Sequence, residues 1–144
     1  MLQATMRIRI EWSHCDPAKI IYNPHYYIWM DHCSHSLLRI AGLDFKDHMD
    51  DPDFKACPLV KSTAEFHSPA FLADQLLLTS QVSRFGNKSF DISHEFQRDN
   101  TLICTGKEIR VWGGTDQRGQ LTAQRVPDWI KENLSLTKIQ DVSV

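Results

Sequence analysis

Hydrophobic and polar residues alternate along several stretches of the chain. The stretch from Met6 to Trp12 alternates apolar with charged side chains, which is typical of a half-buried strand. Later the period of two returns in four segments that turn residues separate: 59–67, 75–85, 88–98 and 101–112. Because tight-turn pairs join the last three segments, we predict strands linked as hairpins.

One long stretch follows a helical period instead. Asn23-Pro24 begins it: Asn is a favoured N-cap, and Pro fits the first turn because its missing N–H has no partner there. Apolar residues then recur at spacings of three and four: Tyr26, Trp29, Met30, Cys33, Leu37, Ile40 and Ala41. The polar residues, including Ser34 and Ser36, fall mostly on the other side. Gly42 closes a predicted helix with one buried face.

The end of the chain is less regular. We expect a short extended segment over 121–125, a final short helix opened by Pro127-Asp128, and a flexible tail over 135–144. One long helix cannot cover both faces of a sheet, so the order of elements predicts an α+β, antiparallel fold. We expect residues 1–144 to form a single domain with its core over about 6–130. Trp12, Trp29 and Trp112 are expected in the core or at an interface.

Composition narrows the class of protein. Apolar residues make up 42% and charged residues 24% of the 144 positions, which excludes a disordered chain. A net charge of −2 argues against a broad nucleic-acid surface. There is no apolar run of membrane-spanning length and no signal-peptide pattern, so we expect a cytoplasmic protein with reduced thiols at Cys15, Cys33, Cys57 and Cys104.

Asp16 is the most informative candidate for chemistry. It lies in a loop just ahead of the helix N-terminus, where unpaired N–H groups and a partial positive charge can stabilise an oxyanion. A carboxylate beside such a site can attack a carbonyl or activate water. On the pattern alone, however, an Asp before Pro17 is more often a turn residue.

Other chemistries find less support in the sequence. On a helix His32 and His35 share a face but Cys33 does not, so no zinc-binding pattern results and we expect no metal. Nothing marks Cys15 as an activated nucleophile. There is no glycine-rich phosphate loop and no G-x-S-x-G elbow, which argues against a serine hydrolase.

The stretch from Asp16 to Asp31, D-P-A-x-I-I-Y-x-P-x-Y-x-x-W-x-D, closely resembles the signature of hotdog-fold acyl-CoA thioesterases. It is most similar to the 4-hydroxybenzoyl-CoA thioesterase branch. The resemblance continues through Gly42, through P-x-x-x-x-D over 69–74 and through K-S-F over 88–90, so it covers about residues 6–130. Three places depart from the family pattern: Lys19 and Ala73 replace the usual Gly, and Gly86-Asn87 replaces basic residues.

This resemblance implies a hotdog fold, in which an antiparallel sheet of roughly five to six strands wraps around the long helix. It also implies dimers that join their sheets edge to edge, often paired into tetramers, with active sites at the subunit interface. Asp16 would be the nucleophile or general base, and the backbone N–H of Asn23 would hold the thioester oxygen.

Further site residues are expected around this pair. Asp31 would contact the acyl group or the partner subunit; alternatively it is solvated or pairs with Arg39. Tyr22 and His25 are candidate substrate contacts; the alternatives are packing under the loop for Tyr22 and a plain surface position for His25. Lys88, Ser89 and Arg84 are the candidate CoA-binding residues.

Two functions from different classes follow. The first is hydrolysis of an acyl-CoA thioester, aromatic or short-to-medium in its acyl group, without a cofactor because CoA is part of the substrate. The second is a non-catalytic module that binds an acyl-CoA or acyl carrier. Asp16 discriminates between them, since a pure binder has no need of an acid at the carbonyl. A hotdog dehydratase is disfavoured because His32 and His35 do not sit in its motif.

Overall fold

A computed structural model describes residues 1–51 and 54–143. In the described part of the chain the main elements, in order, are β1 (Gln3–Arg9), α1 (Pro24–Ile40), β2 (Leu59–Phe66), β3 (Gln75–Phe85), β4 (Ser89–Arg98), β5 (Thr101–Val111), β6 (Gly113–Thr115), β7 (Leu121–Ala123), α2 (Asp128–Leu134) and β8 (Ile139–Val142). Two short 3-10 helices occupy Trp12–His14 and Phe45–Asp47. The predicted long helix and the four strands are therefore confirmed, with shifts of a residue or two at their ends. Of these four strands, only β3, β4 and β5 are linked as hairpins, because β2 pairs with β5 rather than with β3.

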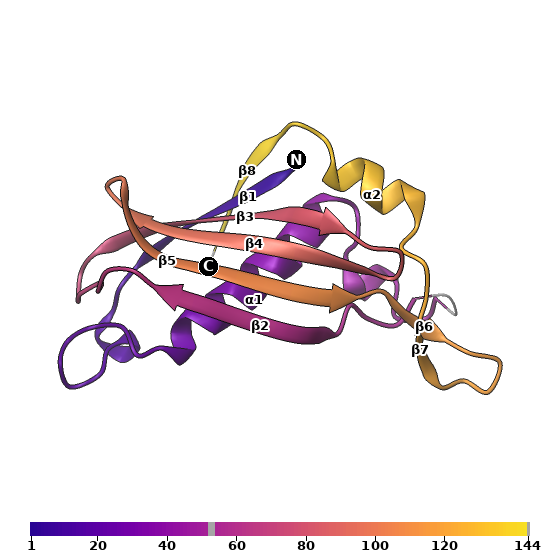
Figure 1. The fold of residues 1–144 in the computed structure, drawn as a ribbon, viewed down its shortest axis with the longest axis horizontal. Helices are drawn as coiled ribbons and strands as arrows, with labels where there is room; N and C mark the ends of the chain where they lie inside the picture. Colours follow the sequence, from indigo (N-terminus) through magenta and orange to yellow (C-terminus); the bar gives the residue numbers. More distant parts are fainter. Residues whose placement is uncertain (52–53, 144) are drawn as a thin grey trace.

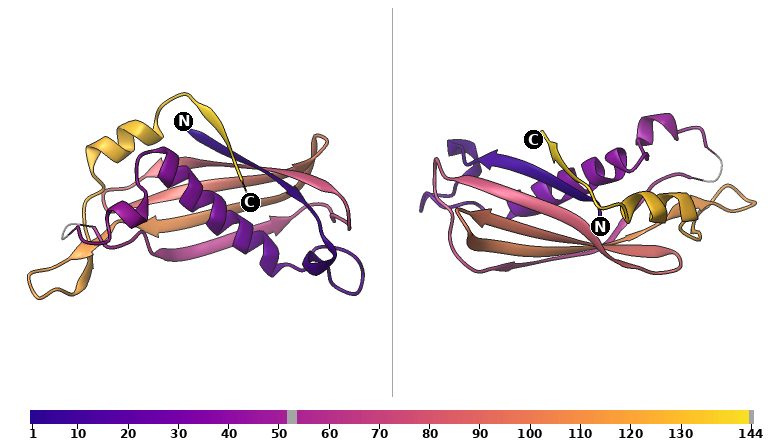
Figure 2. Two further views of the ribbon diagram at one scale, coloured as in Figure 1. Left: turned by 180° about the vertical axis from the view of Figure 1, so that it is seen from behind. Right: turned by 90° about the horizontal axis from the view of Figure 1, so that it is seen from above.

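Six strands form one sheet in the order β2-β5-β4-β3-β1-β8. All neighbours are antiparallel except β1 and β8, which run parallel. The helix α1 crosses one face of this sheet, and α2 lies near the end of β3 (Figures 1 and 2). The result is the predicted α+β arrangement of one curved sheet around one long helix.

Close packing joins α1 to the middle of the sheet. Gly106 in β5 faces Met30, and a Cβ on Gly106 would lie 2.0 Å from the Met30 sulfur, so only glycine fits there. The predicted apolar stripe is buried, but so are Ser34 and Ser36, which we had placed on the solvent side. That prediction was wrong because the sheet curves around more of the helix than a flat surface would cover. Buried polar side chains across from Ser34 give it partners.

Part of the C-terminal tail, which we expected to be flexible, forms a strand, β8. α2 buries Ile130 and Leu134 in the core. The chain then returns as β8, and the Gln3 N–H donates to the Lys138 carbonyl at 2.8 Å. The polar sequence of this tail hid the strand because β8 lies at the sheet edge, where its side chains are largely exposed.

The first strand is likewise shifted toward the N-terminus relative to its prediction. β1 ends at Arg9, and Trp12 begins a 3-10 helix with 70% of its surface exposed, so Trp12 is not a core residue of the single chain. Trp29 and Trp112 are buried as predicted. None of the described helices is long and apolar enough to cross a membrane. All four cysteines are free thiols.

Candidate functional site

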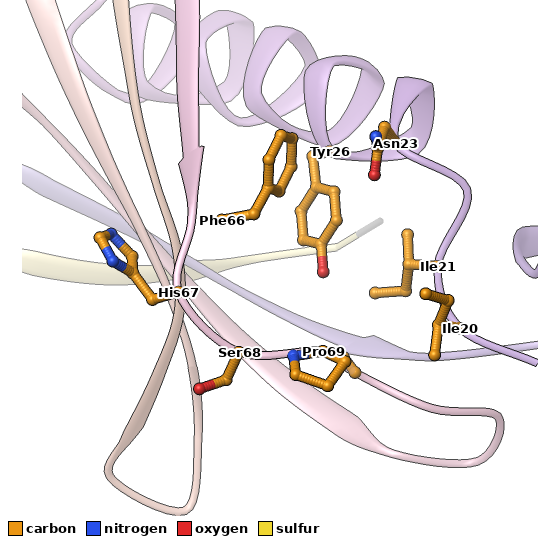
Figure 3. A pocket seen from close by; sticks show the side chains of 9 residues that line it. Ile20, Ile21, Asn23, Tyr26, Phe66, His67, Ser68 and Pro69 are labelled. Carbon is orange, nitrogen blue, oxygen red and sulfur yellow. The ribbon is translucent and has the colours of Figure 1, made fainter.

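A pocket of about 230 Å³ opens where the N-terminus of α1 meets the end of β2 (Figure 3). The segment that leads into α1 forms one wall, the first turn of the helix a second, and the chain that leaves β2 the third. The lining residues are Ile20, Ile21, Asn23, Tyr26, Phe66, His67, Ser68, Pro69 and Ala70. The pocket is apolar with a few polar groups, which is the usual character of a small-molecule site.

Tyr26 is the largest buried side chain of this pocket. Its ring packs against Phe66 and Phe96 with centroid distances of 5.3 and 5.1 Å, and its hydroxyl points into the pocket (Figure 3). Burial raises the pKa of Tyr26 far above its ordinary value, so the hydroxyl stays protonated and can donate a hydrogen bond. Sequence analysis assigned Tyr26 only to the core, since a buried helix position does not reveal which end of the ring meets a cavity.

The helix N-terminus faces the same pocket through Asn23. The helix begins there as predicted, but Asn23 has helical dihedral angles and its side chain caps no N–H group. Its carbonyl accepts from the Tyr26 N–H at 3.1 Å, while its own backbone N–H donates to no group among the described residues. An unpaired N–H at the positive end of a helix suits a carbonyl oxygen or an anion.

Asp16 lies in a small hairpin beside this pocket but does not line it. The Asp16 N–H donates to the Ile20 carbonyl at 2.9 Å, and Ile20 is a wall of the pocket. The carboxylate is partly exposed, and its Oδ1 accepts from the Ala18 N–H at 2.8 Å, as an aspartate at a turn commonly does. The turn interpretation is thus confirmed, and the carboxylate bonds within its own loop.

The two positions where the family usually has Gly lie together beside the pocket and keep a backbone conformation typical of glycine. Lys19 and Ala73 have φ values of 64° and 72°, in the left-handed region that glycine adopts without strain. They are neighbours in space, because the Leu72 N–H donates to the Lys19 carbonyl at 3.2 Å. The loop conformation is therefore compatible with a side chain at both positions, at some cost in strain.

Tyr22 and His25 belong to an aromatic cluster on the outer side of the helix start. His25 packs against His14 at 5.2 Å and Trp29 at 5.8 Å, and Tyr22 meets the His25 ring at 6.3 Å. Neither Tyr22 nor His25 lines the pocket. Tyr22 is 57% exposed, so the alternative that it packs beneath the loop is wrong.

Asp31 has a partner that sequence analysis missed. Its Oδ1 lies 2.6 Å from Nη2 of Arg110, a residue of β5, and 3.5 Å from Nε2 of His35. Arg39, the partner considered from the sequence, bonds instead to Ser36. The Arg110 side chain is only 3% exposed, so a buried cation holds a half-exposed carboxylate. No local pattern could have revealed this pair, which joins residues far apart in the chain.

Lys88, Ser89 and Arg84 lie at the opposite end of the sheet from the pocket. Ser89 pairs with Val111 at the end of the sheet where Leu59 begins β2, whereas the pocket lies past Phe66, at the far end of that strand. The length of β2 separates the two places by roughly 20 Å. Arg84 is also engaged, since its guanidinium makes two hydrogen bonds to Asp91, at 3.2 and 3.3 Å. Within one chain the predicted residues therefore form two groups.

Comparisons with known proteins agree with this fold. A family model described as the thioesterase-like superfamily matches residues 10–134. The 4-hydroxybenzoyl-CoA thioesterase of Pseudomonas sp. strain CBS-3 is 31% identical over 134 residues, covering 88% of this chain and 94% of that protein. A 1,4-dihydroxy-2-naphthoyl-CoA hydrolase of Crocosphaera subtropica is 22% identical over 129 residues, covering 86% and 93%.

A solved structure extends the comparison to three dimensions. An aspartate-to-asparagine mutant of 4-hydroxybenzoyl-CoA thioesterase in complex with 4-hydroxybenzoyl-CoA superimposes with a TM-score of 0.83 at 29% identity. The match covers 92% of this chain and 99% of the other. The resemblance noted in the sequence is confirmed: this chain belongs to the thioesterase-like superfamily and has the hotdog fold.

Proposed function

We propose that this protein hydrolyses the thioester bond of an acyl-CoA whose acyl group is a hydroxylated aromatic acid, releasing the acid and CoA. The observation that carries the proposal is the apolar pocket at the start of α1. Asn23, whose backbone N–H has no partner among the described residues, lines this pocket, and Asp16 is hydrogen-bonded to another lining residue, Ile20. The relatives act on hydroxybenzoyl-CoA and dihydroxynaphthoyl-CoA, which supports an aromatic acyl group over a short or medium aliphatic one.

In the proposed reaction the Asn23 N–H donates to the thioester oxygen, and the helix terminus stabilises the charge that develops there. Asp16 first turns away from the Ala18 N–H. Its carboxylate then attacks the carbonyl carbon, the C–S bond breaks, and CoA leaves as a thiolate. Water hydrolyses the resulting anhydride, which restores the carboxylate and yields the acid. In the water-mediated variant Asp16 takes a proton from water, whose oxygen attacks the carbonyl directly. Neither route needs a cofactor.

A second copy of the chain completes the proposed site. The β2 edge is exposed, and 230 Å³ is below the roughly 300–1,000 Å³ of a typical ligand site. Antiparallel pairing of β2 with its copy would exchange the two ends, so that the Leu59 end of the partner approaches the pocket past Phe66. The proposed active unit is therefore a homodimer, alone or as half of a dimer of dimers.

This pairing would also bring one chain's pocket residues close to the partner residues at the opposite end of the sheet. The partner's Lys88, Ser89 and Arg84 would approach the CoA phosphates by charge and hydrogen bonding. The partner's Asp31 would approach the far end of the acyl group, where a carboxylate can accept a hydrogen bond from a hydroxyl. Tyr22 and His25 would border the entrance. We place this reaction in the cytoplasm.

The test measures thiol release from 4-hydroxybenzoyl-, benzoyl- and hexanoyl-CoA. Asp16→Asn is expected to lower kcat/KM by about 10³-fold, because it removes the attacking or proton-accepting group while the amide can still accept from the Ala18 N–H. Asp116→Asn is the matched control, since Asp116 Oδ1 accepts from the Arg118 N–H at the same 2.8 Å in a distant loop. That variant should retain activity.

The alternative function, acyl-CoA binding without hydrolysis, has one observation in its favour: the Asp16 carboxylate is turned onto its own loop. Tight binding of these esters with no thiol release would establish it. An Asp16→Asn variant that is folded by circular dichroism and fully active would also refute the proposed mechanism.

A further inference from the structure

A chain of polar side chains crosses the core from Asp31 to the middle of the sheet. Arg110 Nη2 meets Asp31 Oδ1 at 2.6 Å, and Arg110 Nε donates to Glu108 Oε2 at 3.0 Å. Glu108 in turn accepts from the Ser34 hydroxyl and lies 3.6 Å from His94 Nε2. Ser34, His94, Glu108 and Arg110 are almost fully buried, so solvent has almost no access to them.

Arg110 is held at three points. Besides Asp31 and Glu108, its Nη1 donates to the Cys57 carbonyl at 3.1 Å. A guanidinium presents its donors in a rigid planar fork, so three contacts in different directions fix its position as well as its charge. Lysine carries the same charge but cannot reproduce this geometry.

Glu108 balances the buried charge of Arg110. Burial alone would raise the pKa of Glu108, but the hydrogen bond from Arg110 and the nearby His94 ring outweigh that effect and lower it to about 2. The carboxylate is therefore ionised at neutral pH. A buried arginine beside an ionised glutamate can hold a second carboxylate without leaving net positive charge in the core.

Asp31 is the exposed end of this chain of contacts. Its side chain is 52% exposed, and both Arg110 and His35 approach its Oδ1. Among the described residues Oδ2 has no hydrogen-bond partner, so it is available to accept one. The pair also lies at the Leu59 end of the open edge, because Arg110 pairs with Leu59 across β5 and β2.

We propose that Arg110, anchored by Glu108, is a positioning residue that aims the Asp31 carboxylate at the hydroxyl of the acyl group. This inference rests on the proposed function and deepens it: Arg110 touches no substrate, yet it determines the preference for hydroxylated over unsubstituted aromatic acyl groups. If Asp31 met no ligand, the contacts of Arg110 with Asp31 and Glu108 would contribute only to stability. In that case Arg110→Lys would not change the preference for hydroxylated acyl groups.

The test is a double-mutant cycle with Arg110→Lys and Asp31→Asn. It measures dissociation constants for two non-hydrolysable thioether analogues of 4-hydroxybenzoyl-CoA and benzoyl-CoA, and kcat/KM for the two thioesters. Arg110→Lys should weaken binding and lower kcat/KM for the hydroxylated compound by about tenfold, the value of a hydrogen bond to a charged group, and change the unsubstituted one less than about twofold. In the Asp31→Asn background it should have no further effect.

Arg39→Lys provides the matched control, because it makes the same chemical change on α1 at a residue that contacts Ser36 rather than Asp31. If Arg110→Lys does not fold, Glu108→Gln keeps the shape of the anchor and should shift the same selectivity ratio in the same direction. Equal losses on both compounds, or additive effects in the cycle, would overturn the proposal. Because the binding arm requires no turnover, a protein that binds these analogues selectively but releases no thiol would refute the hydrolase function alone; failure to discriminate between them would refute the positioning role.

Discussion

The two edges of the sheet contrast sharply. At one edge the chain covers β1 with its own C-terminal strand β8, in a parallel pairing from Gln3 to Met6. At the other edge β2 has no strand partner on its outer side among the described residues, and it exposes Leu59, Val60 and Phe66 by 44%, 60% and 47%. An unpaired strand edge is a template for another chain. The difference fits the proposed dimer, in which the eight-residue edge strand β2, beside the pocket, pairs with a second copy and the four-residue edge strand β8 does not.

Among changes at the two sheet edges, the largest loss of activity is expected from a charge in β2. Val60→Lys replaces an exposed apolar side chain with an ammonium group where two copies of β2 would pair, so the proposed dimer should dissociate into single chains. Because the pocket then loses the partner's residues, kcat/KM should fall by about 100-fold. Light scattering gives the mass, and thiol release gives the activity.

Ile139→Lys makes the same change at the opposite edge of the sheet, in β8, at a residue that is 67% exposed. It should alter neither mass nor activity, because the proposed dimer pairs through β2. If the wild-type protein is fully active and light scattering gives the mass of a single chain, the proposed pairing through β2 is wrong.

Deleting β8 should leave the long strand β1 at the edge of the sheet, as β2 is at the opposite edge. A chain that stops after Thr137 loses β8 and the hydrogen bond from Gln3 to Lys138, and should lose about 3 kcal/mol of unfolding free energy in urea. The exposed β1 edge should also cause concentration-dependent aggregation. Equal stability with and without residues 138–144 would show that β8 contributes nothing.

Low pH should reduce the stability of the protein, because Glu108 in the core between the two edges becomes protonated. The pKa of Glu108 is lowered from 4.5 to about 2, so its contribution is complete above pH 4.5 and is lost as the pH falls toward 2. We expect the unfolding free energy to decrease by about 2 kcal/mol over this range. In Glu108→Gln this part of the decrease should be absent, and an unchanged pH profile would refute the assignment.

The smallest effect, on stability, is expected from Ala73, one of the two residues with positive φ beside the pocket. Ala73→Gly removes left-handed strain at φ 72° and should raise stability by about 0.5–1 kcal/mol in thermal or urea unfolding. Ala123→Gly in β7 should have the opposite sign, because glycine weakens a strand that needs no positive φ. A destabilised Ala73→Gly variant would show that contacts of the methyl group dominate.

The fold was largely predictable because local patterns agree with it. The period of two and the turn pairs gave β3, β4 and β5, and the tight turn at Asp99 and Asn100 is realised with both residues at positive φ, 47° and 68°. Asn23-Pro24 gave the start of α1. In each case the residues that form the element also stabilise it.

Features that depend on distant partners were missed. Ser34 is a polar residue on the side of α1 that the sequence pattern assigns to solvent. Its burial is favourable because its hydroxyl bonds to Glu108 of β5 and His94 of β4. β8 forms because a strand edge is available, although its own sequence is polar. The candidate site was predicted as one group of residues, but a motif cannot show that Lys88 and Asp16 lie at opposite ends of a sheet.

The parallel pairing of β8 with β1 has a consequence for folding of the protein. Residues 3–6 pair with residues 139–142, so this contact closes a loop that spans most of the described chain. Contacts between residues so far apart in sequence form slowly, so the outer side of β1 stays unpaired while the local hairpins β3-β4 and β4-β5 form.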